Sequence, residues 1–145
     1  MHESCQPACI TSQCKRGQCL LVLPSQGVLS IDCDKCGSFP RGKKKPDFIV
    51  LYERGGSSIP IWNIVEMKKS VGHLGRIIEQ LQAGADTIQN HPAFEISSPS
   101  QQLVPLLLHD RHIRTADLAR RRITFRGSSV PVIYKRCGMR LEDES

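Results

Sequence analysis

Residues 46–70 read PDFIVLYERGGSSIPIWNIVEMKKS, and this stretch decides the fold. It contains two apolar, β-branched runs, 46–53 and 61–68, of the kind found in strands that are buried on both faces. The Gly- and Ser-rich connection at 53–60 supplies the turn between them. We therefore predict an antiparallel hairpin, in which the start of the first strand lies beside the end of the second.

A helical pattern follows this hairpin. Between residues 71 and 90, apolar side chains recur at intervals of three and four, which predicts an amphipathic helix. Ser70 is the predicted N-cap, and Pro92 is the predicted stop. Residues 103–109, LVPLLLH, are expected to form a third buried strand, although Pro105 favours an edge or a bulge.

Shorter elements flank this core on both sides. We predict strands at 19–24 and 27–33 before it, then a short basic helix at 110–122 and a closing hairpin at 123–136 after it. This order fits one mixed central sheet, antiparallel at first and flanked by helices, so the predicted fold class is α/β. The predicted divisions are a cysteine-rich N-terminal segment packed on the core, the core and a flexible tail: 1–27, 28–138 and 139–145.

The composition is that of a compact, basic protein. The 145 residues suit one domain, and 20 Lys and Arg against 14 Asp and Glu give a net charge of +6. Positive charge favours nucleic acid or another polyanion as a partner, while 5% aromatic residues argue against a surface that stacks many bases. With no apolar run near the ~18 residues of a membrane span and no secretory signal pattern, we expect a cytoplasmic protein without a membrane partner.

Three charged residues lie at one end of the predicted hairpin. Asp47 opens its first strand, and Glu66 and Lys68 close its second, so the antiparallel pairing brings the two carboxylates together. Glu66 and Lys68 are two residues apart and project from the same face, whereas Met67 between them points the opposite way into packing. The alternative is a salt-bridged strand end with no chemical role.

This cluster has a specific chemical use. Two carboxylates can hold Mg²⁺ while leaving positions for water and a phosphate oxygen. The metal polarises a phosphodiester and lowers the pKa of its bound water, and Lys68 can orient that water or stabilise charge on phosphorus. Without a metal, the two acids repel each other and one pKa rises.

The sequence Pro46-Asp47, followed by Glu66-Met67-Lys68, resembles the PD-(D/E)xK nuclease superfamily of restriction enzymes and Holliday-junction resolvases. The resemblance covers roughly residues 28–109 and implies a restriction-endonuclease-like core. It implies that Asp47 and Glu66 bind Mg²⁺ or Mn²⁺, that the Met67 carbonyl completes the metal shell and that Lys68 assists catalysis. Many members also carry a Glu on a helix before the first strand, where this chain offers only Glu3.

Other residues are candidates for supporting roles. Some members of that superfamily place a Gln of the following helix near the site; here Gln82 borders the apolar stripe and Gln80 lies well off it. Basic residues on both sides of the hairpin are candidates for phosphate contacts, against the alternative of scattered solvated charge. The candidates are Arg41, Lys43, Lys44, Lys45, Arg120, Arg121 and Arg122.

Seven cysteines are expected to be reduced thiols or metal ligands in a cytosolic chain. Cys14 and Cys19, together with the CxxC of Cys33 and Cys36, could supply four thiolates to Zn²⁺. Free buried thiols are the alternative.

Taken together, these residues predict a Mg²⁺-dependent nuclease that hydrolyses DNA and acts as a homodimer. The expected subclass is a structure-selective, resolvase-like enzyme. The alternative is a non-catalytic, basic nucleic-acid-binding module with a zinc-stapled N-terminus. An RNA-cleaving nuclease on the same fold is a third reading.

Overall fold

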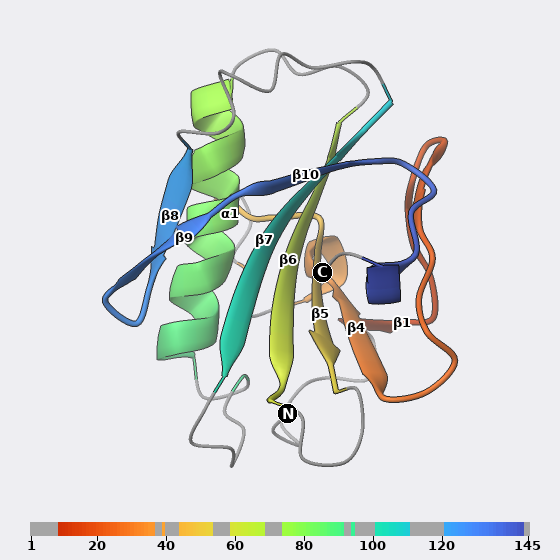
Figure 1. Ribbon diagram of the computed structural model, residues 1–145, viewed down its shortest axis with the longest axis horizontal. Helices are drawn as coiled ribbons and strands as arrows, with labels where there is room; N and C mark the ends of the chain where they lie inside the picture. The colour runs from red at the N-terminus through yellow and green to blue at the C-terminus, as the bar shows by residue number, and fades with distance from the viewer. Residues whose placement is uncertain are drawn as a thin grey trace.

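A computed structural model of the chain describes residues 9–36, 39, 44–53, 59–68, 74–91, 94, 101–110 and 121–143 (Figure 1). Within these residues, one sheet has six strands in the order β1-β4-β5-β6-β7-β10, and β2-β3 and β8-β9 form separate two-stranded ribbons. The strands of the main sheet are β1 (Ile10–Thr11), β4 (Val28–Asp32), β5 (Phe48–Tyr52), β6 (Ile61–Lys68), β7 (Gln102–His109) and β10 (Ile133–Arg136). The ribbons are β2 (Cys14–Arg16) with β3 (Cys19–Leu21), and β8 (Arg122–Phe125) with β9 (Ser128–Pro131).

The predicted hairpin is confirmed. Strands β5 and β6 pair antiparallel, from Phe48 opposite Val65 to Tyr52 opposite Ile61. Helix α1 (Leu74–Asn90) then returns the chain, so that β7 pairs parallel to β6. Because β6 and β7 run in the same direction, their last residues and the start of β5 lie at the same end of the sheet. The mixed α/β sheet expected from the order of elements is therefore present.

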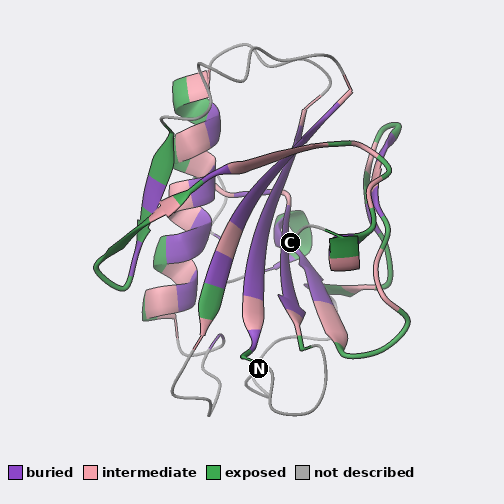
Figure 2. Cartoon of the chain, in the orientation of Figure 1, coloured by how far each residue is buried: buried purple, intermediate pink, exposed green. Residues whose placement is uncertain are grey.

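Alternating side chains of the sheet build two apolar cores. On one face, Ile64 and neighbouring sheet residues pack with Ile77, Leu81 and Ala85 of α1. On the other face, Val65 and Met67 pack with residues of the β2–β3 ribbon. Figure 2 shows buried residues along the central strands and along one side of α1. The sheet is therefore covered on both faces, which accounts for the continuously apolar strands.

Pro105 fits β7 because of where β10 ends. Strand β10 pairs with β7 only from Leu106 to His109, so within the described residues β7 has β6 as its one sheet partner at Pro105. A proline, which lacks an amide hydrogen, is tolerated at such a local edge. The expectation of an edge position is confirmed for this residue.

Three predicted segments differ from the structure. Residues 133–136 leave the predicted closing hairpin and add β10 to the main sheet, so the hairpin itself ends at Pro131. Arg122 begins β8 instead of ending a helix, and 111–120 lie outside the described residues. The expected flexible tail is packed through a 3-10 turn, Leu141–Asp143, in which Leu141 is fully buried. In the described part of the chain, no helix is long and apolar enough to cross a membrane.

Candidate active site

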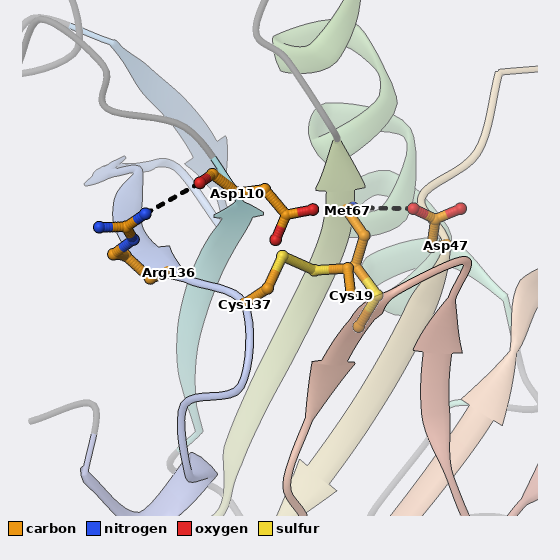
Figure 3. Close-up of a disulfide and its surroundings, with 6 residues drawn as sticks. All are labelled: Cys19, Asp47, Met67, Asp110, Arg136 and Cys137. Carbon is orange, nitrogen blue, oxygen red and sulfur yellow. Dashed lines mark hydrogen bonds between the residues drawn. A yellow bond between two sulfur atoms is a disulfide. The ribbon is translucent and has the colours of Figure 1, made fainter.

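Asp47 and Glu66 meet at the end of the β5–β6 hairpin. The register that pairs Phe48 with Val65 sets Asp47 opposite Glu66. The Asp47 amide donates a hydrogen bond to the Val65 carbonyl at 3.0 Å. The Met67 amide in turn donates to Oδ2 of Asp47 at 2.8 Å, as the dashed line in Figure 3 shows. The Asp47 carboxylate is therefore held across the end of the hairpin by the backbone of β6.

Glu66 is buried beside this carboxylate. Its side chain is almost inaccessible, and its Oε2 has no hydrogen-bond partner among the described residues. Burial, then a hydrogen bond to the Asp47 carboxyl group and the Asp47 charge, together raise the pKa of Glu66 to about 10. In the protein without metal, Glu66 therefore holds a proton at neutral pH. One of the two acids has a raised pKa, as expected, but burial and not repulsion between the acids is the largest cause.

Lys68 completes the cluster that the sequence predicts. It is the last residue of β6, on the same face as Glu66, and it lies opposite His109 of β7. Its positive charge acts in the direction that lowers the pKa of Glu66, against the larger effect of burial. The Met67 side chain is buried in the core on the other face, as its place between these residues predicts.

The donor set fits a divalent cation in part. Asp47 and Glu66 offer two carboxylates, and the unpartnered Oε2 of Glu66 is a buried oxygen that a cation would satisfy. In the described part of the chain, no group of three or more His, Cys, Asp or Glu side chains is arranged to hold a metal ion. The remaining positions would fall to the Met67 carbonyl, water and a substrate oxygen. Glu3, the poor candidate for a further ligand, lies outside the described residues.

Gln82, the predicted supporting residue, forms its hydrogen bonds with Thr124 and Asp86. Its amide nitrogen donates to the Thr124 carbonyl and to Oδ1 of Asp86, each at 2.9 Å, and its oxygen accepts from the Thr124 amide at 2.8 Å. These bonds fasten β8 to α1. Gln82 therefore has a structural role in this arrangement.

Gln80 is the residue that the helical wheel misjudges. One turn after it, Gly84 touches the hairpin: a Cβ on Gly84 would lie 2.7 Å from Ile64 and 2.9 Å from Pro46. Four helical residues rise about 6 Å, close to the two-residue step along β6 from Ile64 to Glu66, so we expect Gln80 near the level of Glu66. The Oε1 of Gln80 is buried without a hydrogen-bond partner among the described residues.

The segment before Asp47 is also fastened to α1 next to Gln80. Lys44 forms an ion pair with Glu79, and Lys45 lies 3.4 Å from Oδ1 of Asp34. Since Glu79 immediately precedes Gln80 in the helix, this contact and that of Pro46 bracket Gln80 on the hairpin side of α1. The sequence signal that would have selected Gln80 over Gln82 is Gly84, a glycine that permits close packing and lies one helical turn after Gln80.

The candidate phosphate-binding residues do not form one described surface. Arg41, Lys43 and Arg120 lie outside the described residues. Arg122 donates from Nε to Oγ of Ser129 at 2.6 Å across the β8–β9 ribbon, and Arg121 is exposed beside it. Lys44 pairs with Glu79 of α1, and Lys45 pairs with Asp34. Both lie within three residues of Asp47 in the chain, whereas Arg122 begins β8 on the far side of α1 in sequence.

The predicted zinc cysteines are not brought together. Cys19 forms a disulfide with Cys137, as Figure 3 shows, so its sulfur is not a free thiolate. Cys14 is a buried free thiol in the core on the β2–β3 face, whereas Cys33 and Cys36 are buried free thiols on the α1 face. Burial raises the pKa of Cys14 to about 12, which keeps it protonated. The four-thiolate site is therefore not assembled, and the expectation that all cysteines are reduced is corrected at Cys19 and Cys137.

Comparison of the sequence and structure with family models, curated proteins and solved structures finds no match.

Proposed function

We propose that this protein is a Mg²⁺-dependent nuclease that hydrolyses phosphodiester bonds in DNA. The observation that carries the proposal is the meeting of Asp47 and buried Glu66 at one strand end, with Lys68 on the same face. Keeping two acids this close and one of them buried is unfavourable in the absence of a cation, and such strained titratable groups concentrate at functional sites. A salt-bridged strand end would account for Asp47, whose Oδ1 lies 3.4 Å from Nε of Arg16. It would not account for the burial of the Glu66 carboxyl group.

Each residue of the cluster has a definite task in this function. Asp47 and Glu66 bind the metal, and the bond from the Met67 amide fixes the orientation of Asp47. When bound, Mg²⁺ would polarise the phosphodiester and make its water a stronger nucleophile. Lys68 donates a hydrogen bond to the attacking water or to the phosphoryl oxygens as their charge grows. The amide of Gln80 is placed to hold the water or a phosphate oxygen beside Glu66.

The arrangement of the elements supports a restriction-endonuclease-like core. An antiparallel hairpin carries the acids, one helix follows it, and the next strand pairs parallel to the second hairpin strand. This is the context that the resemblance of Pro46-Asp47 and Glu66-Met67-Lys68 implies. The fold proposal and the site proposal therefore rest on the same segment, residues 46–109.

The net charge of +6 supports a nucleic acid as the substrate. A homodimer would place two metal sites across the two strands of a duplex, and a resolvase-like preference for branched DNA is the proposed subclass. A cytoplasmic location stays a prediction; the Cys19–Cys137 disulfide is a type of bond that is rare in a reducing cytosol.

The test is cleavage of labelled branched, duplex and single-stranded DNA and of single-stranded RNA, each with Mg²⁺, with Mn²⁺ and with EDTA. We expect metal-dependent cleavage of DNA that Lys68→Ala reduces at least about 100-fold while DNA affinity is kept. Lys15→Ala is the matched control, because Lys15 is an exposed lysine on β2. Binding without cleavage under either metal would favour the non-catalytic binding module. Cleavage of RNA alone would instead favour the third hypothesis, an RNA-cleaving nuclease on the same fold.

A further inference from the structure

The β2–β3 ribbon carries an arginine to the edge of the candidate site. Arg16 is the last residue of β2 and pairs with Cys19 of β3. Cys19 is bonded to Cys137 and packs in the same core as Met67, so the ribbon is fixed on the face opposite α1. Figure 3 shows this disulfide at the same end of the sheet as Asp47. The cysteine-rich N-terminal segment, which was expected only to pack on the core, therefore reaches the site.

The guanidinium of Arg16 joins three acidic residues. Its Nη2 lies 2.6 Å from Oδ1 of Asp32, and its Nη1 donates to Oδ2 of the same carboxylate at 3.3 Å. Nη2 also lies 3.0 Å from Asp34, and Nε lies 3.4 Å from Oδ1 of Asp47. The guanidinium carbon sits 4.3 Å from the centre of the Phe48 ring. A guanidinium group with this many partners is fixed in position. Its planar set of donors suits this arrangement, whereas the single ammonium group of a lysine would not.

The result is that both oxygens of the Asp47 carboxylate are engaged. Oδ2 accepts the hydrogen bond from the Met67 amide, and Oδ1 faces Nε of Arg16. Each carboxylate oxygen has two lone pairs, and one that remains is used by the hydrogen bond with Glu66 in the metal-free protein. That lone pair becomes available when Glu66 loses its proton. Arg16 also draws close to the Asp47 carbonyl, at 3.5 Å from Nη2. The carboxylate is thus oriented from two sides and retains the capacity to bind a cation.

We propose that Arg16 is a positioning residue for Asp47. This inference rests on the proposed nuclease function, in which Asp47 binds the metal. Asp32 and Asp34 hold the guanidinium, the guanidinium holds Oδ1 of Asp47, and the Met67 amide holds Oδ2. Without Arg16, Asp47 would lose one of its two restraints and would face the uncompensated charges of Asp32 and Asp34. The acidic ligand would then turn away from the direction that the reaction needs.

The kinetic test uses Arg16→Gln and Arg16→Lys, with Arg140→Gln as the control. Arg140 makes a comparable single ion pair with Glu142 at 3.6 Å. Misplacing a reacting group by about 1 Å costs about 100-fold, so we expect kcat at saturating Mg²⁺ to fall about 10- to 100-fold in Arg16→Gln. Removing the guanidinium charge favours the dication, whereas misorienting Asp47 disfavours it, so the variants are compared at saturating Mg²⁺. Arg16→Lys should recover part of kcat. An unchanged kcat in the folded variant would overturn the proposal.

A double-mutant cycle tests the contact without relying on activity. Arg16→Gln, Asp47→Asn and the double variant are unfolded with urea in the absence of metal. If Arg16 restrains Asp47, the shift in unfolding midpoint of the double variant is smaller than the sum of the two single shifts. Additive shifts would show that no such restraint exists. A wild type that cleaves no substrate would instead overturn the proposed function, and the cycle would still decide whether Arg16 fixes Asp47.

Discussion

Replacing Glu66 by glutamine should stabilise the metal-free protein while removing its function. Glu66→Gln keeps the shape of the side chain. Its amide N–H group takes the place of the Glu66 carboxyl proton that is hydrogen-bonded to the Asp47 carboxyl group. It removes the ability of residue 66 to carry a negative charge. Stability and metal binding are therefore predicted to change in opposite directions, which an ordinary core residue would not do.

The magnitude follows from the pKa of Glu66, about 10 in the folded protein against an ordinary value of 4.5. Between these values, the folded protein holds a proton that the unfolded chain releases. The free energy of unfolding therefore falls as pH rises, by about 1.4 kcal/mol per pH unit. At about pH 7.5, some three units above the ordinary value, the cost approaches about 4 kcal/mol. At about pH 4 it is well below about 1 kcal/mol.

The assay is urea unfolding in EDTA, followed by the fluorescence of Trp62, which is the single tryptophan and is fully buried. We expect Glu66→Gln to be more stable than the wild type by about 1 to 4 kcal/mol at about pH 7.5, allowing for an amide that is less well satisfied than in water. The difference should nearly vanish at about pH 4. Equal stability at about pH 7.5, or a gain that does not change with pH, would refute the reasoning.

Three further predictions concern the surroundings of the site. Gly84→Ala should destabilise the protein by about 1 to 3 kcal/mol because the added Cβ would lie less than 3 Å from atoms of Ile64 and Pro46. Gly75→Ala is the control: it has open space around it and should be neutral or stabilising by up to about 1 kcal/mol. Thermal unfolding of the two variants tests this difference. Gln80→Ala should lower the cleavage rate with little loss of stability, whereas Gln82→Ala should lower the free energy of unfolding by about 1 to 2 kcal/mol because it removes the bonds to β8. Cleavage rates and urea unfolding of both variants separate the two roles. The reverse pattern would restore Gln82 as the supporting residue. Reduction of the Cys19–Cys137 disulfide, whose cysteines are 118 residues apart, should lower the unfolding free energy by about 2 to 5 kcal/mol, and an unchanged urea midpoint after reduction would contradict this.

Patterns of local period predicted the central elements well. The hairpin was readable from two continuous apolar runs, and the helix was readable from apolar residues at intervals of three and four. The local edge at Pro105 followed from its missing amide hydrogen, although β7 itself lies between β6 and β10. Strand β10 was misjudged because its partner, β7, lies upstream beyond 111–120 and the β8–β9 ribbon. Pairing between distant strands leaves no periodic mark that distinguishes it from a local hairpin.

The acidic cluster was also predictable, since antiparallel pairing fixes which residues share a strand end. Distant contacts were not. The Cys19–Cys137 bond crosses 118 residues, and nothing in the spacing of seven cysteines selects this pair. Arg16 lay in the cysteine-rich segment that was expected only to pack on the core. Its acidic partners are distant in sequence: Asp32 and Asp34 lie 16 and 18 residues away, and Asp47 lies 31 residues away.

The most direct test of the site is binding of Mn²⁺, followed by electron paramagnetic resonance, to the wild type and to Asp47→Asn. The Asp143→Asn variant is the control, because Asp143 is an exposed aspartate in the C-terminal turn. If Asp47 and Glu66 form a divalent-cation site, the wild type and Asp143→Asn bind one Mn²⁺ per chain and Asp47→Asn binds it at least about 10-fold more weakly. Equal binding by Asp47→Asn, or no binding by the wild type, would contradict the account.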